Sequence, residues 1–126
     1  MKTTLFSLLL SITSFSLLAQ VTPEWMRYPS VSPEGTTIAF VYQGDIYTVG
    51  VEGGEAQRLT FQPEMDVQPV WSPDGQNIAF ASERHGNFDV YVMDAKGGEA
   101  TRLSYHSNYE MPLSFSADGR LIYFDA

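Results

Sequence analysis

The sequence contains no cysteine among its 126 residues, which excludes disulfide bonds and a lipid-modified cysteine. It is also poor in basic residues, with seven Lys and Arg against fifteen Asp and Glu. Because an acidic surface repels phosphate backbones, nucleic acid is not an expected partner. The sequence lacks a basic amphipathic segment as well, so we expect no membrane binding by the mature chain.

Long apolar runs are also absent, apart from the 14 residues from Leu5 to Leu18. This run is too short for a membrane anchor, which needs about 20 residues. Lys2 precedes it and Ala19 follows it, as in a secretory signal peptide. We therefore predict a signal peptide over 1–20 and an exported protein, periplasmic or extracellular. Removal of the signal peptide leaves six basic and fifteen acidic residues, a net charge of −9.

The rest of the chain repeats itself. Residues 29–40 read PSVSPEGTTIAF and residues 69–80 read PVWSPDGQNIAF. Residues 53–60, GGEAQRLT, return at 97–104 as GGEATRLS, and DIYTV at 45–49 returns as DVYVM at 89–93. A third copy opens at Ser116 with SADGRLIYF. Self-similarity at a period of 40 to 44 residues is typical of a repeat architecture.

The second copy predicts four short antiparallel strands: Gln68–Trp71, Ile78–Ser82, Asp89–Met93 and Glu99–Ser104. The turn SPDG at 72–75 separates the first two, because proline presets φ and glycine accepts a positive φ. No helical periodicity follows the signal peptide. Four strands per repeat favour a β-propeller over a β-sandwich, whose strands occupy unlike environments and need not resemble each other.

We therefore predict an all-β fold, a partial β-propeller of about two and a half four-stranded antiparallel blades within 21–126. The expected blades are about 28–60, about 68–104 and, in part, 112–126. Four extra residues between Ser82 and Asp89 predict a longer hairpin loop in the second copy. Since a propeller closes with about four to eight blades, we expect the chain to be a fragment of a longer protein, and expect it to self-associate when isolated.

Three sets of polar residues could carry chemistry. They are the serines Ser32, Ser72 and Ser116, the histidines His85 and His106, and the carboxylates Glu34, Asp74, Asp118, Asp45 and Asp89. The serines recur because every blade needs the same turn, and no G-x-S-x-G motif exists. The histidines lack a metal-binding spacing, and single carboxylates on separate blades do not make a calcium cage. We favour surface positions for the histidines and turn or strand-end hydrogen bonding for the carboxylates.

The aromatic residues could form a binding stripe, but their spacing favours packing between blades. They are Trp71, Tyr47, Tyr91 and Phe80. The glycine pairs at 53–54 and 97–98 predict hairpin turns, because a phosphate-binding loop would need a strand and a helix on either side. The sequence thus predicts no catalytic residue, no cofactor-binding residue, no metal ligand and no cofactor.

The repeat SPDGQNIAFAS…DVYVMDAKGGEATRLS resembles the blades of TolB-type and tricorn-type propellers. Residues 25–49 and 83–107 resemble most the start of exported bacterial tricorn protease homologues. This resemblance implies a serine peptidase whose propellers gate peptides towards later catalytic domains, and it implies peptides or proteins as partners and a possible homo-oligomer of the full-length protein. No position here matches the family's catalytic serine or histidine. The alternative is a TolB-like, non-enzymatic protein-binding propeller in the periplasm.

Overall fold

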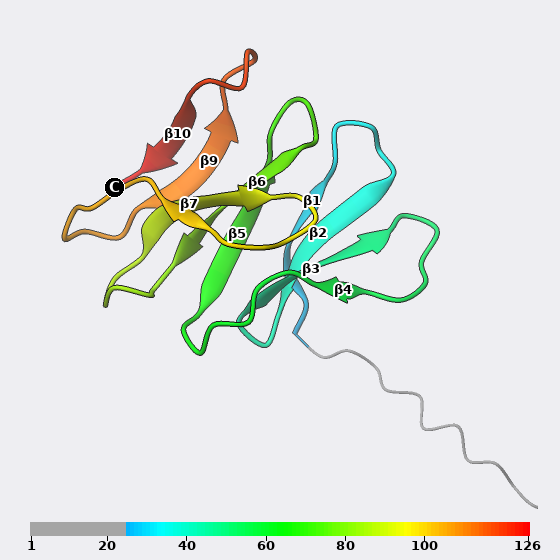
Figure 1. Cartoon of the computed structure of the whole chain (residues 1–126), viewed down its shortest axis with the longest axis horizontal. Coiled ribbons are helices and arrows are strands. Elements are labelled where there is room, and N and C mark those ends of the chain that lie inside the picture. Colours follow the sequence, from blue (N-terminus) through cyan, green and yellow to red (C-terminus); the bar gives the residue numbers. More distant parts are fainter. Residues whose placement is uncertain (1–24) are drawn as a thin grey trace, which may run out of the picture.

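The structure is a computed structural model and describes residues 25–126, so the expected signal peptide at 1–20 lies outside the described residues. The described chain forms three antiparallel sheets, seen in sequence order from blue to red in Figure 1. No helix occurs between residues 25 and 126.

Each sheet corresponds to one copy of the repeat, and we call the sheets blades 1, 2 and 3. Blade 1 contains β1 (Arg27–Val31), β2 (Thr37–Tyr42), β3 (Asp45–Gly50) and β4 (Gln57–Arg58). Blade 2 contains β5 (Asp66–Trp71), β6 (Asn77–Ser82), β7 (Asp89–Asp94) and β8 (Thr101–Arg102). Blade 3 contains β9 (Met111–Phe115) and β10 (Ile122–Asp125). Within blades 1 and 2 the strands pair in sequence order.

Turns of the same design join the first two strands of every blade. In blade 2 the Gly75 amide donates to the Ser72 carbonyl at 2.9 Å, and Gly75 has a φ of +69°. That φ lies in the left-handed region, which glycine adopts without a steric penalty. The repeated glycine of the sequence therefore closes the turn that the repeat predicted.

The first strands of successive blades lie side by side, since β1 contacts β5 and β5 contacts β9. An irregularity recurs in β1 and β5, where the pairing register shifts between Arg27 and Ser30 and between Val67 and Val70. The skipped residues include Tyr28 and Gln68, with φ values of 53° and 55°. Equivalent β-bulges at equivalent positions indicate that the two blades are copies in geometry as well as in sequence.

The core lies between blades 1 and 2. It consists of Ala39, Val41, Ile46 and Leu59 from blade 1 and its following linker, packed with Ile78, Phe80, Tyr91 and Met93 from blade 2. Aliphatic side chains of blade 1 and its linker thus meet aliphatic and aromatic side chains of blade 2. Trp71 packs against this cluster, and its Nε1 donates to the Ser30 carbonyl across the blades at 2.9 Å.

The fold prediction is confirmed: the described chain is all-β and propeller-like, with four-stranded antiparallel sheets. The segments DIYTV and DVYVM lie in successive sheets, in β3 and β7, and do not pair with each other. The fourth strands are shorter than expected. After each of them the backbone makes one more hydrogen bond to the third strand, and a side chain makes the next one. In blade 2 the Leu103 amide donates to the Val90 carbonyl, and the Ser104 hydroxyl then accepts from the Val90 amide.

Candidate functional site

The recurrent serines lie in the turns between first and second strands. The Ser72 hydroxyl donates to Asp74 Oδ1 at 2.5 Å and accepts from the Asn77 amide at 2.9 Å. Ser116 makes the same two bonds, to Asp118 and from the amide of Leu121. The Ser72 hydroxyl and the Gln76 amide both donate to the Asp74 carboxylate, and they lower the pKa of that carboxyl, the hydroxyl more than the amide. The serines therefore organise turns, as the repeat suggested.

Replacing Ser72 with alanine is expected to lower the free energy of unfolding by about 1 kcal/mol, the usual net value of a lost hydrogen bond. Chemical denaturation of the variant and the parent measures the difference. Ser116→Ala, in the exposed turn of blade 3, is the matched control and should cost less. Peptide hydrolysis that disappears in Ser72→Ala would contradict the structural role.

The two histidines are exposed. His85 Nδ1 lies 2.6 Å from the Tyr91 hydroxyl, and His106 Nδ1 accepts from the Asn108 amide at 3.2 Å. Burial raises the pKa of the Tyr91 hydroxyl. Across residues 25–126, no group of three or more His, Cys, Asp or Glu is placed to hold a metal ion.

The carboxylates Asp45 and Asp89 each pair with an arginine of the fourth strand of their own blade. Asp45 Oδ2 lies 2.7 Å from Arg58, and Asp89 Oδ2 lies 2.8 Å from Arg102. Sequence reasoning assigned these aspartates to strand-end bonding but missed the arginines. The sequence could have indicated these pairs, because the arginine in GGEAQRLT recurs in GGEATRLS at the same number of residues after its aspartate.

A third ion pair has no counterpart in blade 1. Arg84, from the longer hairpin of blade 2, lies 3.0 Å from Asp66 Oδ2, whose side chain is fully buried. The Arg84 guanidinium also lies over the rings of Phe80 and Tyr91, at 5.3 and 5.0 Å from their centroids. Burial raises the pKa of the Asp66 carboxyl, against the opposing effects of the Ser82 hydroxyl and the Arg84 charge. This loop is therefore anchored in the junction between blades 1 and 2.

The four predicted packing aromatics do not share one environment. Phe80 and Tyr91 are buried in the core, and Trp71 packs on it. Tyr47 instead lies on the outer face of blade 1, where it stacks on Phe40 with 5.8 Å between ring centroids. That face holds an apolar hollow of about 680 Å³. Its lining includes Pro29, Ile38, Phe40, Tyr42, Tyr47 and Val49.

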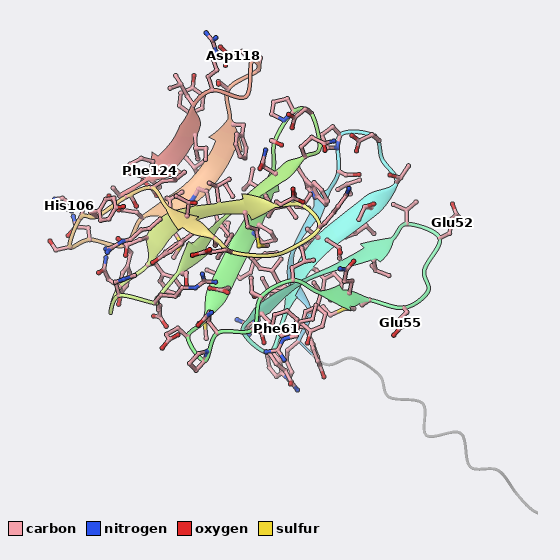
Figure 2. All side chains as sticks on the ribbon, viewed as in Figure 1. Glu52, Glu55, Phe61, His106, Asp118 and Phe124 are labelled. Carbon is pink, nitrogen blue, oxygen red and sulfur yellow. The ribbon has the colours of Figure 1, made fainter. Side chains whose placement is uncertain are left out.

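The candidate binding site is a pocket of about 590 Å³ at the end of blade 1 that carries the linker to blade 2. We call it the linker-end pocket. Its walls are the start of β1, the tip of the β2–β3 hairpin and the linker itself. They include Trp25, Arg27, Tyr28, Gly44, Glu64 and Met65. Figure 2 shows Phe61 of this linker near the bottom of the view and Asp118, in the turn of blade 3, at the top.

The side chains that line this site offer a ligand guanidinium groups, carboxylates, amides, a phenol hydroxyl at Tyr28 and an indole at Trp25. Neither histidine and none of the recurrent serines lines it. In the part of the chain that the structure describes, no helix is long and apolar enough to span a membrane.

Curated relatives match parts of the chain. The identity is 46% over 55 residues to the uncharacterized peptidase YuxL of Bacillus subtilis, covering 40% of this chain and 8% of that protein. It is 36% over 67 residues to a protein TolB homolog of Chlorobium luteolum, covering 53% and 15%. Tricorn protease homolog 1 of Streptomyces coelicolor is 33% identical over 64 residues, covering 51% and 6%. Their matched parts thus amount to less than a sixth of each relative's length.

Solved structures share the fold. TolB from Acinetobacter baumannii superposes with a TM-score of 0.67 at 28% identity, covering 77% of this chain and 25% of that chain. The tricorn protease superposes with a TM-score of 0.65 at 21% identity, covering 77% of this chain and 10% of that chain. The second likeness concerns the fold alone.

A family model extends the match to the whole described chain. The model of the tricorn protease N-terminal beta propeller domain matches residues 23–126. It covers both complete copies of the repeat and the opening of the third. The chain therefore belongs to the family of tricorn protease N-terminal β-propeller domains.

Proposed function

We propose that residues 21–126 are the N-terminal part of the propeller of an exported, tricorn-like serine peptidase. In this proposal the propeller gates or channels peptides to a catalytic domain outside this chain. The observation that carries it is the match of the tricorn N-terminal propeller model to residues 23–126. Relatives named as a peptidase and as a tricorn protease homolog support it. The signal-like start of the sequence supports export, to the periplasm or the outside of the cell.

The distribution of side chains is consistent with a supporting role in proteolysis. The recurrent serines are engaged in turn hydrogen bonds, and the two histidines lie within hydrogen-bond distance of Tyr91 and Asn108, not of those serines. A nucleophile needs a base within hydrogen-bond reach. This segment therefore contributes binding and access to the reaction, and the chemistry takes place in another domain.

A second function has its own support. The superposition on TolB and the 36% identity to a TolB homolog favour a TolB-like propeller that binds proteins without cleaving them. The repeat cannot separate the two functions, because both use the same blade. The two proposals differ in whether further domains follow the blades.

The test combines the reading frame after Ala126 with a hydrolysis assay of the full-length protein. The peptidase proposal expects further blades, then a peptide-binding domain and a serine-containing catalytic domain, and cleavage of fluorogenic peptides that a serine-directed inhibitor blocks. Residues 21–126 alone serve as the control and should cleave nothing. A product that stops after five to seven blades and cleaves no peptide would establish the TolB-like alternative.

A further inference from the structure

The linker-end pocket exists because the hairpin of blade 1 is four residues shorter than that of blade 2. The two hairpins meet their linkers through the same backbone bond. The Asp66 amide donates to the Gly44 carbonyl at 2.7 Å, and the Glu110 amide donates to the Phe88 carbonyl at 2.8 Å. Gly44 and Phe88 therefore hold equivalent places in the two blades.

In blade 2 an aromatic ring fills this place. The Phe88 ring packs edge-on against Tyr109 of the following linker, with 5.7 Å between centroids. The Asn87 side chain binds the same linker to the hairpin by donating to the carbonyls of His106 and Asn108, both at 2.9 Å. The repeat itself thus shows what fits between hairpin and linker, namely an aromatic side chain.

In blade 1 the same place is open. Gly44 offers no side chain, and Met65, at the position of Tyr109, is 49% exposed. Trp25, 72% exposed, and Tyr28, 44% exposed, also line the pocket. Exposed apolar groups around a hollow mark a binding surface better than isolated ones do. An aromatic ring in the pocket would therefore meet apolar side chains from the start of β1 and from the linker.

The charged side chains that line the pocket indicate which charge a ligand should carry. Arg58 is already paired with Asp45. Arg27 lies over the Trp25 ring, at 5.3 Å from its centroid, and makes no salt bridge with any residue from 25 to 126. Its guanidinium is thus available to a carboxylate at the pocket rim, where a charge-assisted hydrogen bond gains both strength and orientation.

We propose that the linker-end pocket binds an aromatic side chain of a polypeptide, and that Arg27 pairs with an acidic residue next to it in that polypeptide. The ring enters the place that Phe88 fills in blade 2 and lies between Trp25 and Met65. This assignment deepens the proposed function and rests on it only for the class of partner, a polypeptide. It makes blade 1 the recognition blade of the segment.

The test is calorimetric titration of the full-length gene product with the blocked peptide acetyl-Gly-Asp-Phe-Gly-amide, which is checked afterwards by mass spectrometry for cleavage. Replacing Phe with Ala in the peptide, or Trp25→Ala in the protein, should weaken binding about fivefold or more. Arg27→Gln should weaken it about tenfold. Arg27→Glu should reverse the preference, so that the peptide with Lys in place of Asp binds better.

Matched controls lie outside the pocket. Tyr105→Ala removes an aromatic side chain that is exposed to the same 72% as Trp25, and Arg120→Gln removes another exposed arginine. Both should leave the affinity unchanged. Absence of binding, equal binding of the Phe and Ala peptides, or equal losses in variants and controls would overturn the pocket assignment. Such results leave the hydrolysis assay untouched, whereas binding without hydrolysis would overturn only the peptidase proposal.

Discussion

Replacing Phe80 with alanine is expected to lower the free energy of unfolding by about 3–5 kcal/mol, the range for truncating a buried phenylalanine. Phe80 is fully buried between blades 1 and 2, and its ring stacks on Tyr91 at 5.8 Å. Since the whole stability of a domain is only about 5–15 kcal/mol, this loss is a large part of the margin. Denaturant titration followed by tryptophan fluorescence measures it, because Trp71 packs against the same cluster.

The control is Phe40→Ala, since Phe40 occupies in blade 1 the position that Phe80 occupies in blade 2. Phe40 stacks on Tyr47 but faces the apolar hollow of the outer face. In this chain its loss should cost less, about 1.5–3 kcal/mol, because fewer partners surround it. Equal costs for the two variants would mean that blade 1 is covered as blade 2 is, by another blade or by a second copy.

Much of the fold could be predicted from the sequence because the blades are copies. The turn between the first two strands has its serine and its glycine in every blade, and an acidic residue between them, so the recurrence of these residues located the strands on either side. The arginines of the fourth strands recurred as well, and a search for repeated charges of opposite sign would have paired them with Asp45 and Asp89. Repetition therefore reports what every blade requires.

The same logic explains what the sequence could not show. Asp66 stands where the first copy has Met26 and the third copy has Glu110, and Arg84 belongs to the insertion of the second copy, so the pair of Asp66 and Arg84 occurs in blade 2 alone. The linker-end pocket depends on a missing side chain, at Gly44, and on a shorter hairpin. A feature present in one blade alone leaves no trace in a comparison of copies, although specific binding and specific anchoring depend on such differences.

The loop that carries Arg84 leads to the last prediction. Breaking a buried ion pair leaves an uncompensated charge, and Asp66 has no exposed surface through which water could stabilise it. Arg84→Ala is therefore expected to cost about 3–5 kcal/mol of unfolding free energy at neutral pH. Arg58→Ala is the matched control. Its side chain is 40% exposed, so it should cost about 1 kcal/mol or less.

The pH dependence of this loss separates charge from packing. The pKa of the Asp66 carboxyl is raised in the folded protein, so the folded state holds that proton more tightly than the unfolded chain does. The contribution of Asp66 to stability therefore falls as pH rises from 3.8 through the raised value. Without Arg84 the folded pKa moves higher still. The deficit of Arg84→Ala should grow as pH rises through this window and shrink on acidification, where protonated Asp66 needs no counter-charge.

A double-mutant cycle with Asp66→Asn completes the test. If the charge of Asp66 causes the loss, Arg84→Ala should cost much less in the Asp66→Asn background, and the remaining cost should not vary with pH. A deficit that is independent of pH and unchanged by Asp66→Asn would show that Arg84 acts through its contacts with Phe80 and Tyr91 alone. The ion pair of Arg84 and Asp66 would then not be what anchors this hairpin loop of blade 2 at the junction with blade 1.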